Sequence, residues 1–239
     1  MNKERLKTGL EMMGVAADET ALDRFEAFHA ILDEYNARMD LTAVLDEDER
    51  VDRHDLDSAA PLVHGLLAQG AKVIDVGTGA GFPGMPLLIL RPDLQITFLD
   101  ALNKRILFLE DALKRLGLTA ATLHARAEDA AKMAAHREQY DAAVSRAVAN
   151  AATLEELTLP FVKKGGVAIA WKGPGVADEL TAARRAAFLL GGTVRGTVDA
   201  PIPRRADWAH VLLLTDKTGT TPKAYPRKAG TPGKKPLGM

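Results

Sequence analysis

An apolar run that enters a glycine-rich loop is the feature that most constrains the fold of this chain. Residues 73–76 read Val-Ile-Asp-Val, and residues 77–84 read Gly-Thr-Gly-Ala-Gly-Phe-Pro-Gly. A short apolar run bounded by glycines is typical of a central parallel strand. Closely spaced glycines let the backbone turn sharply and place no bulky side chain against a ligand. The segment therefore predicts a strand, a loop and a helix that bind a nucleotide-like cofactor.

Two cofactors use such loops, and the residues around the glycines separate them. Residues 79–84 match the dinucleotide pattern G-x-G-x-x-G, in which free amides at a helix N-terminus hold a pyrophosphate. Pro83 has no N–H to offer an anion, and the acidic Asp75 precedes the first glycine by two residues. S-adenosyl-L-methionine has no phosphate and carries a cationic amino group, which a carboxylate at a strand end attracts. We therefore expect S-adenosyl-L-methionine, and an NAD-dependent dehydrogenase is the alternative.

A second acidic residue follows the next apolar segment. Residues 94–99 alternate in the manner of a strand and end at Asp100, about 20 to 25 residues beyond the loop. A carboxylate at the carboxyl end of a strand beside the loop can accept hydrogen bonds from two ribose hydroxyls. The alternative role for Asp100 is an N-cap of the helix expected from about Asn103. We favour the ribose role.

Composition excludes several classes of site. The 239 residues include no cysteine, so disulfides, thiolate metal sites and a cysteine nucleophile are ruled out. The histidines His29, His64, His124, His136 and His210 show no metal-ligand spacing, and we expect no metal. The first residues lack the apolar core of a signal peptide, and no segment approaches the roughly 18 apolar residues of a membrane span. We expect a cytoplasmic protein.

The order of the expected elements defines the fold class. Amphipathic helices over about residues 20–38 and 49–68 come first, with a shorter helix containing Leu6, Leu10 and Met13 before them. Strands and helices then alternate from residue 73 to about residue 215. This alternation predicts an α/β fold with a mostly parallel, seven-stranded sheet and helices on both faces. Residues 1–68 are expected to form a helical extension packed on an α/β domain at 69–216.

Charge is unevenly distributed along the chain. Residues 1–60 hold 16 acidic and 7 basic side chains, whereas residues 201–239 hold 8 basic and 2 acidic ones. The last 18 residues include four prolines as well as several lysines and glycines. We therefore expect residues 217–239 to form a flexible basic tail that can contact phosphate.

Several short segments, in a fixed order, carry a family resemblance. They are Asp40 to Val44, Arg53 to Ser58, Asp75 to Gly84, Leu99-Asp100, Lys104-Arg105, Arg126 to Glu128, Ser145-Arg146-Ala147 and Lys172-Gly173. Together they resemble the RsmG family, also called GidB, of small-subunit ribosomal RNA guanine-N7 methyltransferases. Many members have asparagine at the position of Asp40 and leucine at that of Phe82; neither difference removes a group that the chemistry requires.

The resemblance implies a fold, a reaction and a partner. The fold is the Rossmann-like class I S-adenosylmethionine-dependent methyltransferase fold with a helical extension. The reaction is methylation of N7 of a guanine in 16S ribosomal RNA, guanosine 527 in the standard numbering of that RNA. The partner is this RNA or the small ribosomal subunit, and we expect a monomer. A methyltransferase acting on another RNA or a small acceptor is the alternative.

Candidate site residues follow from the loop, the strand ends and the resemblance. For the cofactor they are Asp75, Gly77, Thr78, Gly79, Gly81, Phe82, Asp100, Ala127, Glu128 and Arg146. For RNA they are Arg53, His54, Lys104, Arg105, Lys172, Arg227, Lys228, Lys234 and Lys235.

Several of these residues have an ordinary structural alternative. Glu128 can favour a helix dipole from the first turn, and Arg146 can form a salt bridge with Asp75 or Glu128. His54 can make a structural hydrogen bond. Exposed lysines such as Lys172 and Lys104 are often simply solvated. Trp171 and Trp208 are expected in the core.

The expected reaction needs few chemical groups from the protein. Methylation of pyrimidine carbon 5 requires a cysteine, which is absent. Methylation of an exocyclic amine calls for acceptors of the kind found in an Asp/Asn-Pro-Pro-aromatic turn, whereas residues 145–148 read Ser-Arg-Ala-Val. Guanine N7 has a free lone pair and no proton to lose, so alignment alone can supply roughly 7 to 11 kcal/mol of the barrier. We assign no catalytic base.

Overall fold

The computed structural model describes residues 1–146 and 149–239, which form one sheet of seven strands. The part of the expected turn at Ala147 and Val148 lies outside the described residues. The strands are β1 (Lys72–Val76), β2 (Gln95–Asp100), β3 (Ala121–His124), β4 (Tyr140–Arg146), β5 (Val162–Lys172), β6 (Gly192–Asp199) and β7 (Val211–Lys217). Their order is β3-β2-β1-β4-β5-β7-β6, and β7 runs antiparallel to both of its neighbours. The predicted mostly parallel α/β fold is confirmed.

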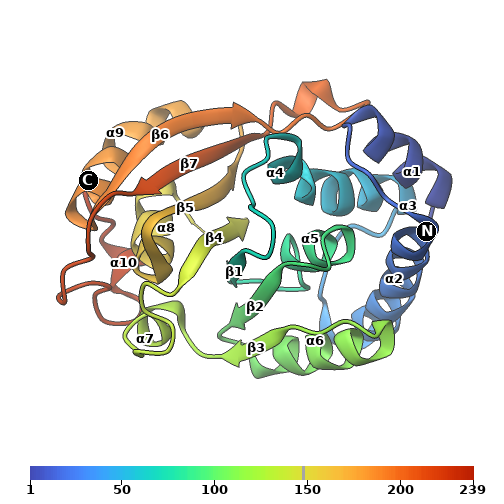
Figure 1. Ribbon diagram of the computed structural model, residues 1–239, viewed down its shortest axis with the longest axis horizontal. Coiled ribbons are helices and arrows are strands. Elements are labelled where there is room, and N and C mark those ends of the chain that lie inside the picture. Colours follow the sequence, from blue (N-terminus) through green and yellow to red (C-terminus); the bar gives the residue numbers. More distant parts are fainter. Residues whose placement is uncertain (147–148) are drawn as a thin grey trace.

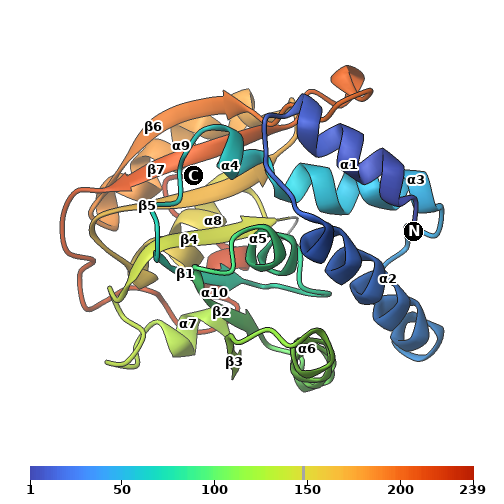
Figure 2. The same ribbon diagram turned by 45° about the vertical axis from the view of Figure 1, so that its right-hand side comes forward.

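Helices cover both faces of this sheet (Figures 1 and 2). The longer ones are α1 (Lys3–Met12), α2 (Glu19–Met39), α6 (Asn103–Leu116), α8 (Ala151–Thr158) and α9 (Val176–Leu189). The shorter ones are α3 (Glu47–Arg50), α4 (Ala60–Val63), α5 (Gly84–Leu90), α7 (Ala127–Ala130) and α10 (Thr231–Lys234). Helices α5 and α6 pack on one face with α2 outside them, and α8 and α9 pack on the other. Helix α7 has only four residues.

The central strand β1 is buried on both faces, as its uninterrupted apolar sequence predicts. Val73 belongs to the apolar cluster under α5 and α6, while Ile74 belongs to the cluster under α8 and α9. Both side chains are fully buried. Because side chains alternate across a strand, a central strand needs apolar residues at successive positions. The glycine loop therefore starts from a strand that is buried on both faces.

The N-terminal helices support the glycine loop directly. Phe25 and Phe28 of α2 are completely buried, and the Phe28 ring lies 5.6 Å from that of Phe82 and 6.2 Å from that of Phe108 in α6. The region expected as one or two helices over 49–68 contains α3, α4 and, between them, a π-helical turn at Val51–Leu56. Such wider turns are frequent at functional sites.

The C-terminal segment differs from the expected flexible tail, because it packs on α8. Pro226, Pro232 and Leu237 are buried. The Arg227 guanidinium lies 2.6 Å from the Glu156 carboxylate, which is fully buried on α8. The Gly230 amide donates to the Glu128 carboxylate at 2.7 Å. The composition of the segment suggests disorder, but its few apolar residues and Arg227 have specific partners that composition cannot reveal.

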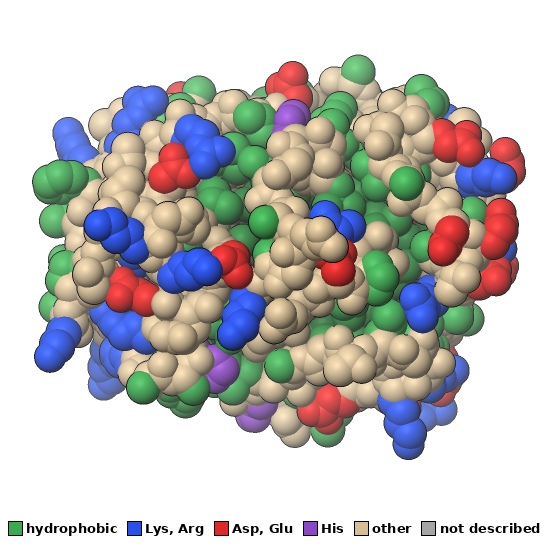
Figure 3. Space-filling model, in the orientation of Figure 1, with side chains coloured by type: hydrophobic (Ala, Val, Ile, Leu, Met, Phe, Trp, Pro, Cys, Tyr) green, Lys and Arg blue, Asp and Glu red, His purple; other side chains and the backbone are tan. Residues whose placement is uncertain are grey.

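The two ends of the molecule differ in charge. Figure 3 shows Asp and Glu side chains gathered at the right-hand end, over the helical extension, and Lys and Arg side chains spread over the left-hand end. This agrees with the acidic first 60 residues and the basic last 39. Among the helices that the structure describes, none is both long and apolar enough to cross a membrane.

Candidate functional site

A pocket of about 450 Å³ lies at the carboxyl ends of β1 and β2. Open α/β sheets bind ligands at this edge. The lining comes from the glycine loop, the end of β2, the N-terminus of α6 and the helical extension. The residues are Leu41, Thr42, His54, Gly77, Thr78, Gly79, Ala80, Phe82, Asp100, Ala101, Leu102, Arg105 and Arg146. We call this cavity the cofactor pocket, because the sequence predicts the cofactor there.

The glycine loop is tied to the end of β2 and packed closely against α6. The amides of Gly77 and Thr78 donate to the Leu99 carbonyl at 2.9 and 3.1 Å. Gly81 has a φ of 93°, and a Cβ at this position would stand 2.8 Å from a methyl group of Leu109. Any side chain here would be both strained and overpacked. Glycine at this position therefore lets the loop approach α6 closely.

Asp75 lies beneath the loop rather than in the cofactor pocket. Its carboxylate is fully buried and accepts hydrogen bonds from the Thr78 hydroxyl at 2.7 Å and the Gly84 amide at 2.9 Å. Its Oδ1 has no partner among the described residues. Burial raises the pKa of Asp75 to about 6, although these two hydrogen bonds favour the ionised form. These hydrogen bonds show that Asp75 fixes the shape of the loop, and its attraction of the cofactor amino group stays a prediction.

Asp100 connects β2, the loop and α6. Its Oδ2 accepts from the Gly79 amide at 3.0 Å and from Arg105 at 3.2 Å, and its Oδ1 accepts from the Leu102 amide at 2.8 Å. Leu102, and not Asp100, is the N-cap residue of α6. A carboxylate has about four acceptor positions, of which Asp100 uses three within the described part of the chain. One acceptor position of Asp100, which lines the cofactor pocket, is unused within the described residues.

Phe82, His54 and Arg146 form a stack at the other side of the cofactor pocket. The rings of His54 and Phe82 lie 4.4 Å apart with an interplanar angle of 22°, and the Arg146 guanidinium stands 5.3 Å from the centre of the Phe82 ring. Arg146 Nη2 lies 3.2 Å from His54 Nδ1, and Thr42 Oγ1 lies 2.8 Å from His54 Nε2. Because a guanidinium only donates, His54 Nδ1 must accept, and the proton is placed on Nε2.

The charge state of His54 agrees with this tautomer. Burial, with the positive charge of Arg146 as the second cause, lowers the pKa of His54 to about 3. A protonated imidazole would place two positive groups in contact. At physiological pH His54 is therefore a neutral side chain that lines the site, and it does not act as an acid.

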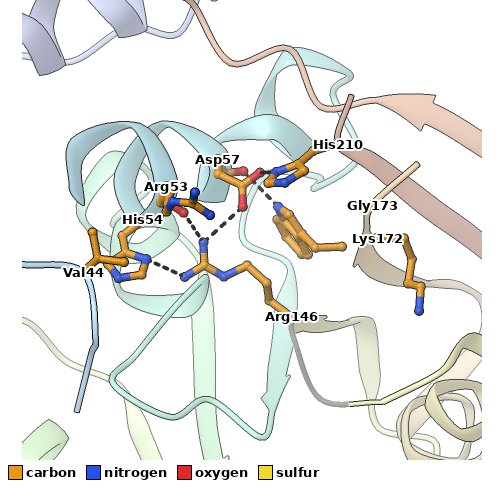
Figure 4. A pocket seen from close by; sticks show the side chains of 9 residues that line it. Val44, Arg53, His54, Asp57, Arg146, Lys172, Gly173 and His210 are labelled. Atoms are coloured by element: carbon orange, nitrogen blue, oxygen red, sulfur yellow. Dashed lines mark hydrogen bonds and ion pairs between the residues drawn. The ribbon is translucent and has the colours of Figure 1, made fainter. Parts of the chain in front are cut away.

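Arg146 is held by the helical extension. The sequence suggested Asp75 or Glu128 as its carboxylate partner, but the ion pair is with Asp57, at 3.1 Å (Figure 4). The Arg146 Nη1 also donates to the Arg53 carbonyl at 2.6 Å. Asp57 in turn accepts from His210 at 3.2 Å, and its carbonyl accepts from the Trp171 indole at 2.9 Å. The π-helical turn and the residue that follows it thus orient the strand-end arginine.

A second pocket, of about 360 Å³, adjoins the cofactor pocket at Arg146 and His54. Its lining residues are Val44, Arg53, His54, Asp57, Arg146, Trp171, Lys172, Gly173 and His210. Figure 4 shows their side chains gathered between the π-helical turn, the end of β4 and the end of β5. His54 and Arg146 are shared with the cofactor pocket.

Several other predicted site residues lie outside the cofactor pocket or are bonded to other groups of the protein. Ala127 and Glu128 follow β3 and do not line the cofactor pocket. Lys172 is paired with Glu179 at 2.7 Å, and Lys104 donates to the Met39 carbonyl at 3.4 Å. Arg227 is paired with Glu156, as described above.

Other predicted basic residues near the site and on the C-terminal segment are exposed, and Arg53 among them is paired with Glu49 at 2.6 Å. Arg53 is 44% exposed and stacks on Trp208, with 4.4 Å between the guanidinium and the ring centre. Trp208 is half-buried, not a core residue as expected. Lys228, Lys234 and Lys235 are exposed.

Sequence reasoning did not identify Thr42, Asp57 and His210 as site residues. Asp57 and His210 are 153 positions apart in the chain. The segments 40–44 and 53–58 carried the resemblance, but nothing in their spacing indicated which side chain would meet Arg146. No group of three or more potential metal ligands occurs in the described ranges 1–146 and 149–239.

The fold and the position of the pocket define the class of protein. A TehB-like SAM-dependent methyltransferase from Corynebacterium glutamicum aligns with 80% of this chain and 99% of its own, with a TM-score of 0.51 and 16% identity. A putative sarcosine dimethylglycine methyltransferase from Galdieria sulphuraria aligns with 80% of this chain and 98% of its own, with a TM-score of 0.56 and 15% identity. The chain has the Rossmann-like class I S-adenosylmethionine-dependent methyltransferase fold.

Sequence comparison shows the family. The family model GidB, described as rRNA small subunit methyltransferase G, matches residues 21–204. Ribosomal RNA small subunit methyltransferase G of Alkaliphilus metalliredigens is 43% identical over 237 residues, which are 99% of both chains. The protein of the same name from Clostridium perfringens strain 13 is 41% identical over 97% of both chains. The chain belongs to the rRNA small subunit methyltransferase G family.

Proposed function

We propose that this chain transfers the methyl group of S-adenosyl-L-methionine to N7 of a guanine in 16S ribosomal RNA. The observation that carries the proposal is the similarity to named family members over nearly the whole chain. The pocket at the carboxyl ends of β1 and β2 supports it independently, because it adjoins a second cavity large enough for a base. The cytoplasm, where ribosomes assemble, is the corresponding location. We expect the monomer to be active.

The residues of the cofactor pocket suit S-adenosyl-L-methionine. The volume of about 450 Å³ lies within the range of small-molecule sites. Asp100 has an open acceptor position for one ribose hydroxyl, and displacement of Arg105, which is 35% exposed, frees a second. The backbone of Gly77, Thr78 and Gly79 borders the same space.

The adenine end of the cofactor would lie beyond Asp100, toward α7. Asp100 is paired in register with His124 of β3, and the Ala125 amide donates to the Asp100 carbonyl. Ala127 and Glu128 follow immediately and open α7. We assign their backbone to the adenine ring. The Glu128 Oε1 also accepts from the Gly230 amide at 2.7 Å, which holds this side chain against the C-terminal segment.

Methyl transfer to N7 requires no group of the protein to accept a proton. The cofactor supplies an electrophilic methyl group attached to a sulfonium. The N7 lone pair forms the new N–C bond while the C–S bond breaks, with its electron pair going to sulfur. The products are S-adenosylhomocysteine and a guanine ring that carries the positive charge. The protein therefore has to align the two reactants and exclude water.

Basic groups around the pockets form the proposed RNA surface. Arg53 beside Trp208 offers a cation and an aromatic ring at the mouth of the second pocket. Lys104 and Arg105 border the cofactor side, and Lys172 lies at the end of β5. The exposed Lys228, Lys234 and Lys235 extend this surface toward α10. Phosphate contacts of this kind position an RNA without reading its sequence.

Two measurements on the purified protein test the proposed function. Calorimetry with S-adenosylhomocysteine and with NAD compares the two cofactor classes, and we expect binding of the first only. Nucleoside analysis of 16S RNA from small-subunit particles treated with protein and S-adenosyl-L-methionine should then show 7-methylguanosine. A methyl group on an exocyclic amine or a ribose would contradict the proposal.

A further inference from the structure

We propose that the second pocket is the acceptor site for a single guanine base turned out of the RNA, and that Asp57 selects guanine. The inference rests on the proposed function and adds where the base binds and what recognises it. The Asp57 carboxylate would accept from guanine N1–H and the N2 amine, and Arg146 would donate to O6. N7 would then face the cofactor pocket beside His54 and Arg146, which line both cavities.

The two pockets share part of their lining. His54 and Arg146 line both cavities, so the acceptor and the methyl donor would meet at this pair. An enzyme that modifies a base must take it out of its stack into a pocket of its own. The volume of about 360 Å³ suits one purine with part of its ribose. Val44 and Trp171 supply apolar walls for the flat faces of the ring.

The polar groups of the pocket match the guanine edge. Guanine offers two adjacent donors, N1–H and the N2 amine, next to the acceptor O6. Asp57 is 3% exposed and lines the pocket, and as a carboxylate it can only accept. Within the described residues its side chain receives one bond from Arg146 and one from His210, so acceptor positions remain on both oxygens. Adenine presents no such pair of donors and would leave these remaining acceptor positions on the buried carboxylate unused.

Arg146 has donors left for O6. A guanidinium has five N–H groups. Three of them reach the Arg53 carbonyl, Asp57 and His54, and among the described residues Nε–H and the second Nη2 hydrogen have no acceptor. O6 neighbours N7 on the ring, so a donor at this position also directs N7 toward the cofactor pocket.

Charge favours the same assignment. Methyl transfer leaves a positive charge on the guanine ring, and the negative charge of Asp57 would lie at the opposite edge of that ring. Asp57 contacts the substrate in this arrangement. His210 is a positioning residue that holds Asp57 through its Oδ1, and Trp171, besides contacting the base, holds Asp57 through its carbonyl. Preorganised charge of this kind lowers the barrier without moving during the reaction.

The test compares two RNA substrates with two proteins. Small-subunit particles carry either guanosine or inosine, which lacks the N2 amine, at the methylated position. The wild-type protein should show a kcat/KM about 10- to 100-fold lower on inosine, because one of the two hydrogen bonds to Asp57 is lost. Asp57→Asn should reduce this ratio to below about 3-fold. Asp93→Asn, which alters a carboxylate remote from both pockets, should keep the wild-type ratio.

The outcomes separate this inference from the proposed function. No methylation of the guanosine particle by wild-type protein would mean that the proposed function fails. Methylation with the same inosine penalty in wild type and Asp57→Asn would overturn the role of Asp57.

A second measurement needs no variant. Photocrosslinking of 6-thioguanosine at the target position to wild-type protein should label a peptide containing Arg146 or Asp57. A crosslink confined to residues 218–239 would place the base elsewhere and overturn the inference.

Discussion

Replacement of Glu155 by glutamine should make the protein more stable at high pH. Glu155 lies on α8 and is 3% exposed; its Oε1 accepts from the Thr215 hydroxyl at 2.7 Å, and its Oε2 has no partner in the described residues. Burial raises its pKa from 4.5 to about 8. The folded protein therefore favours the protonated carboxyl group. Glutamine resembles that form and cannot ionise.

The size of the effect follows from the pKa. Between pH 4.5 and pH 8 the unfolded chain loses this proton while the folded chain keeps it, so the wild type loses stability as pH rises. Each pH unit in this window costs about 1.4 kcal/mol, which gives about 3 kcal/mol at pH 7 and about 5 kcal/mol above pH 8. Below pH 4.5 the contribution is constant. The advantage of Glu155→Gln over the wild type should therefore grow by about 4 kcal/mol from pH 5 to pH 8.5.

Denaturant unfolding at these two pH values is the assay. The adjacent Glu156 provides the matched control, since it is also buried but is paired with Arg227. Glu156→Gln should be less stable than the wild type at pH 8.5 by about 1 to 3 kcal/mol, because it leaves Arg227 without a charged partner. A stability difference between Glu155→Gln and wild type that does not change with pH would refute the reasoning.

Three further predictions concern the site and the RNA surface. Asp100→Ala should weaken S-adenosylhomocysteine binding about 10- to 100-fold through loss of charge-assisted hydrogen bonds, and unchanged affinity by calorimetry would contradict the ribose role. The pKa of His54 is lowered to about 3, so the stability that neutral His54 contributes is present above about pH 6.5 and is lost as pH falls toward 3. The variant His54→Gln should lose less stability over this range in acid unfolding curves. A variant with the same pH dependence as the wild type would argue against a neutral buried imidazole. Joint replacement of Lys228, Lys234 and Lys235 by glutamine should lower the slope of log affinity for 16S RNA against log salt by up to about 2, whereas an unaltered slope would mean that these lysines do not meet phosphate.

The central features of the fold could be predicted because their signals are local. The strand and loop over 73–84 combine an apolar run with closely spaced glycines, and both come from the same short segment. The acidic end of β2 lies next to that loop because consecutive strands here are neighbours. Burial of β1 on both faces likewise follows from its uninterrupted apolar sequence.

Features that depend on distant segments could not be predicted. The partner of Arg146 is Asp57, which is 89 positions earlier in the chain, and a salt bridge of this kind leaves no periodic signal. The hydrogen bonds between Asp75 and the loop were also not predicted, because a carboxylate at a strand end can face either the ligand or the loop. The packing of the C-terminal segment on α8 was not predicted either, because proline and lysine content does not show that Arg227 pairs with one buried carboxylate, Glu156.

Transfer of a labelled methyl group to a defined nucleotide tests the central claim most directly. The protein is incubated with radiolabelled S-adenosyl-L-methionine and small-subunit particles that lack the modification, and the labelled nucleotide is mapped. We predict label at N7 of one guanine of 16S ribosomal RNA. Particles that stay unlabelled, with a protein that binds S-adenosylhomocysteine, would contradict the account and point to another acceptor.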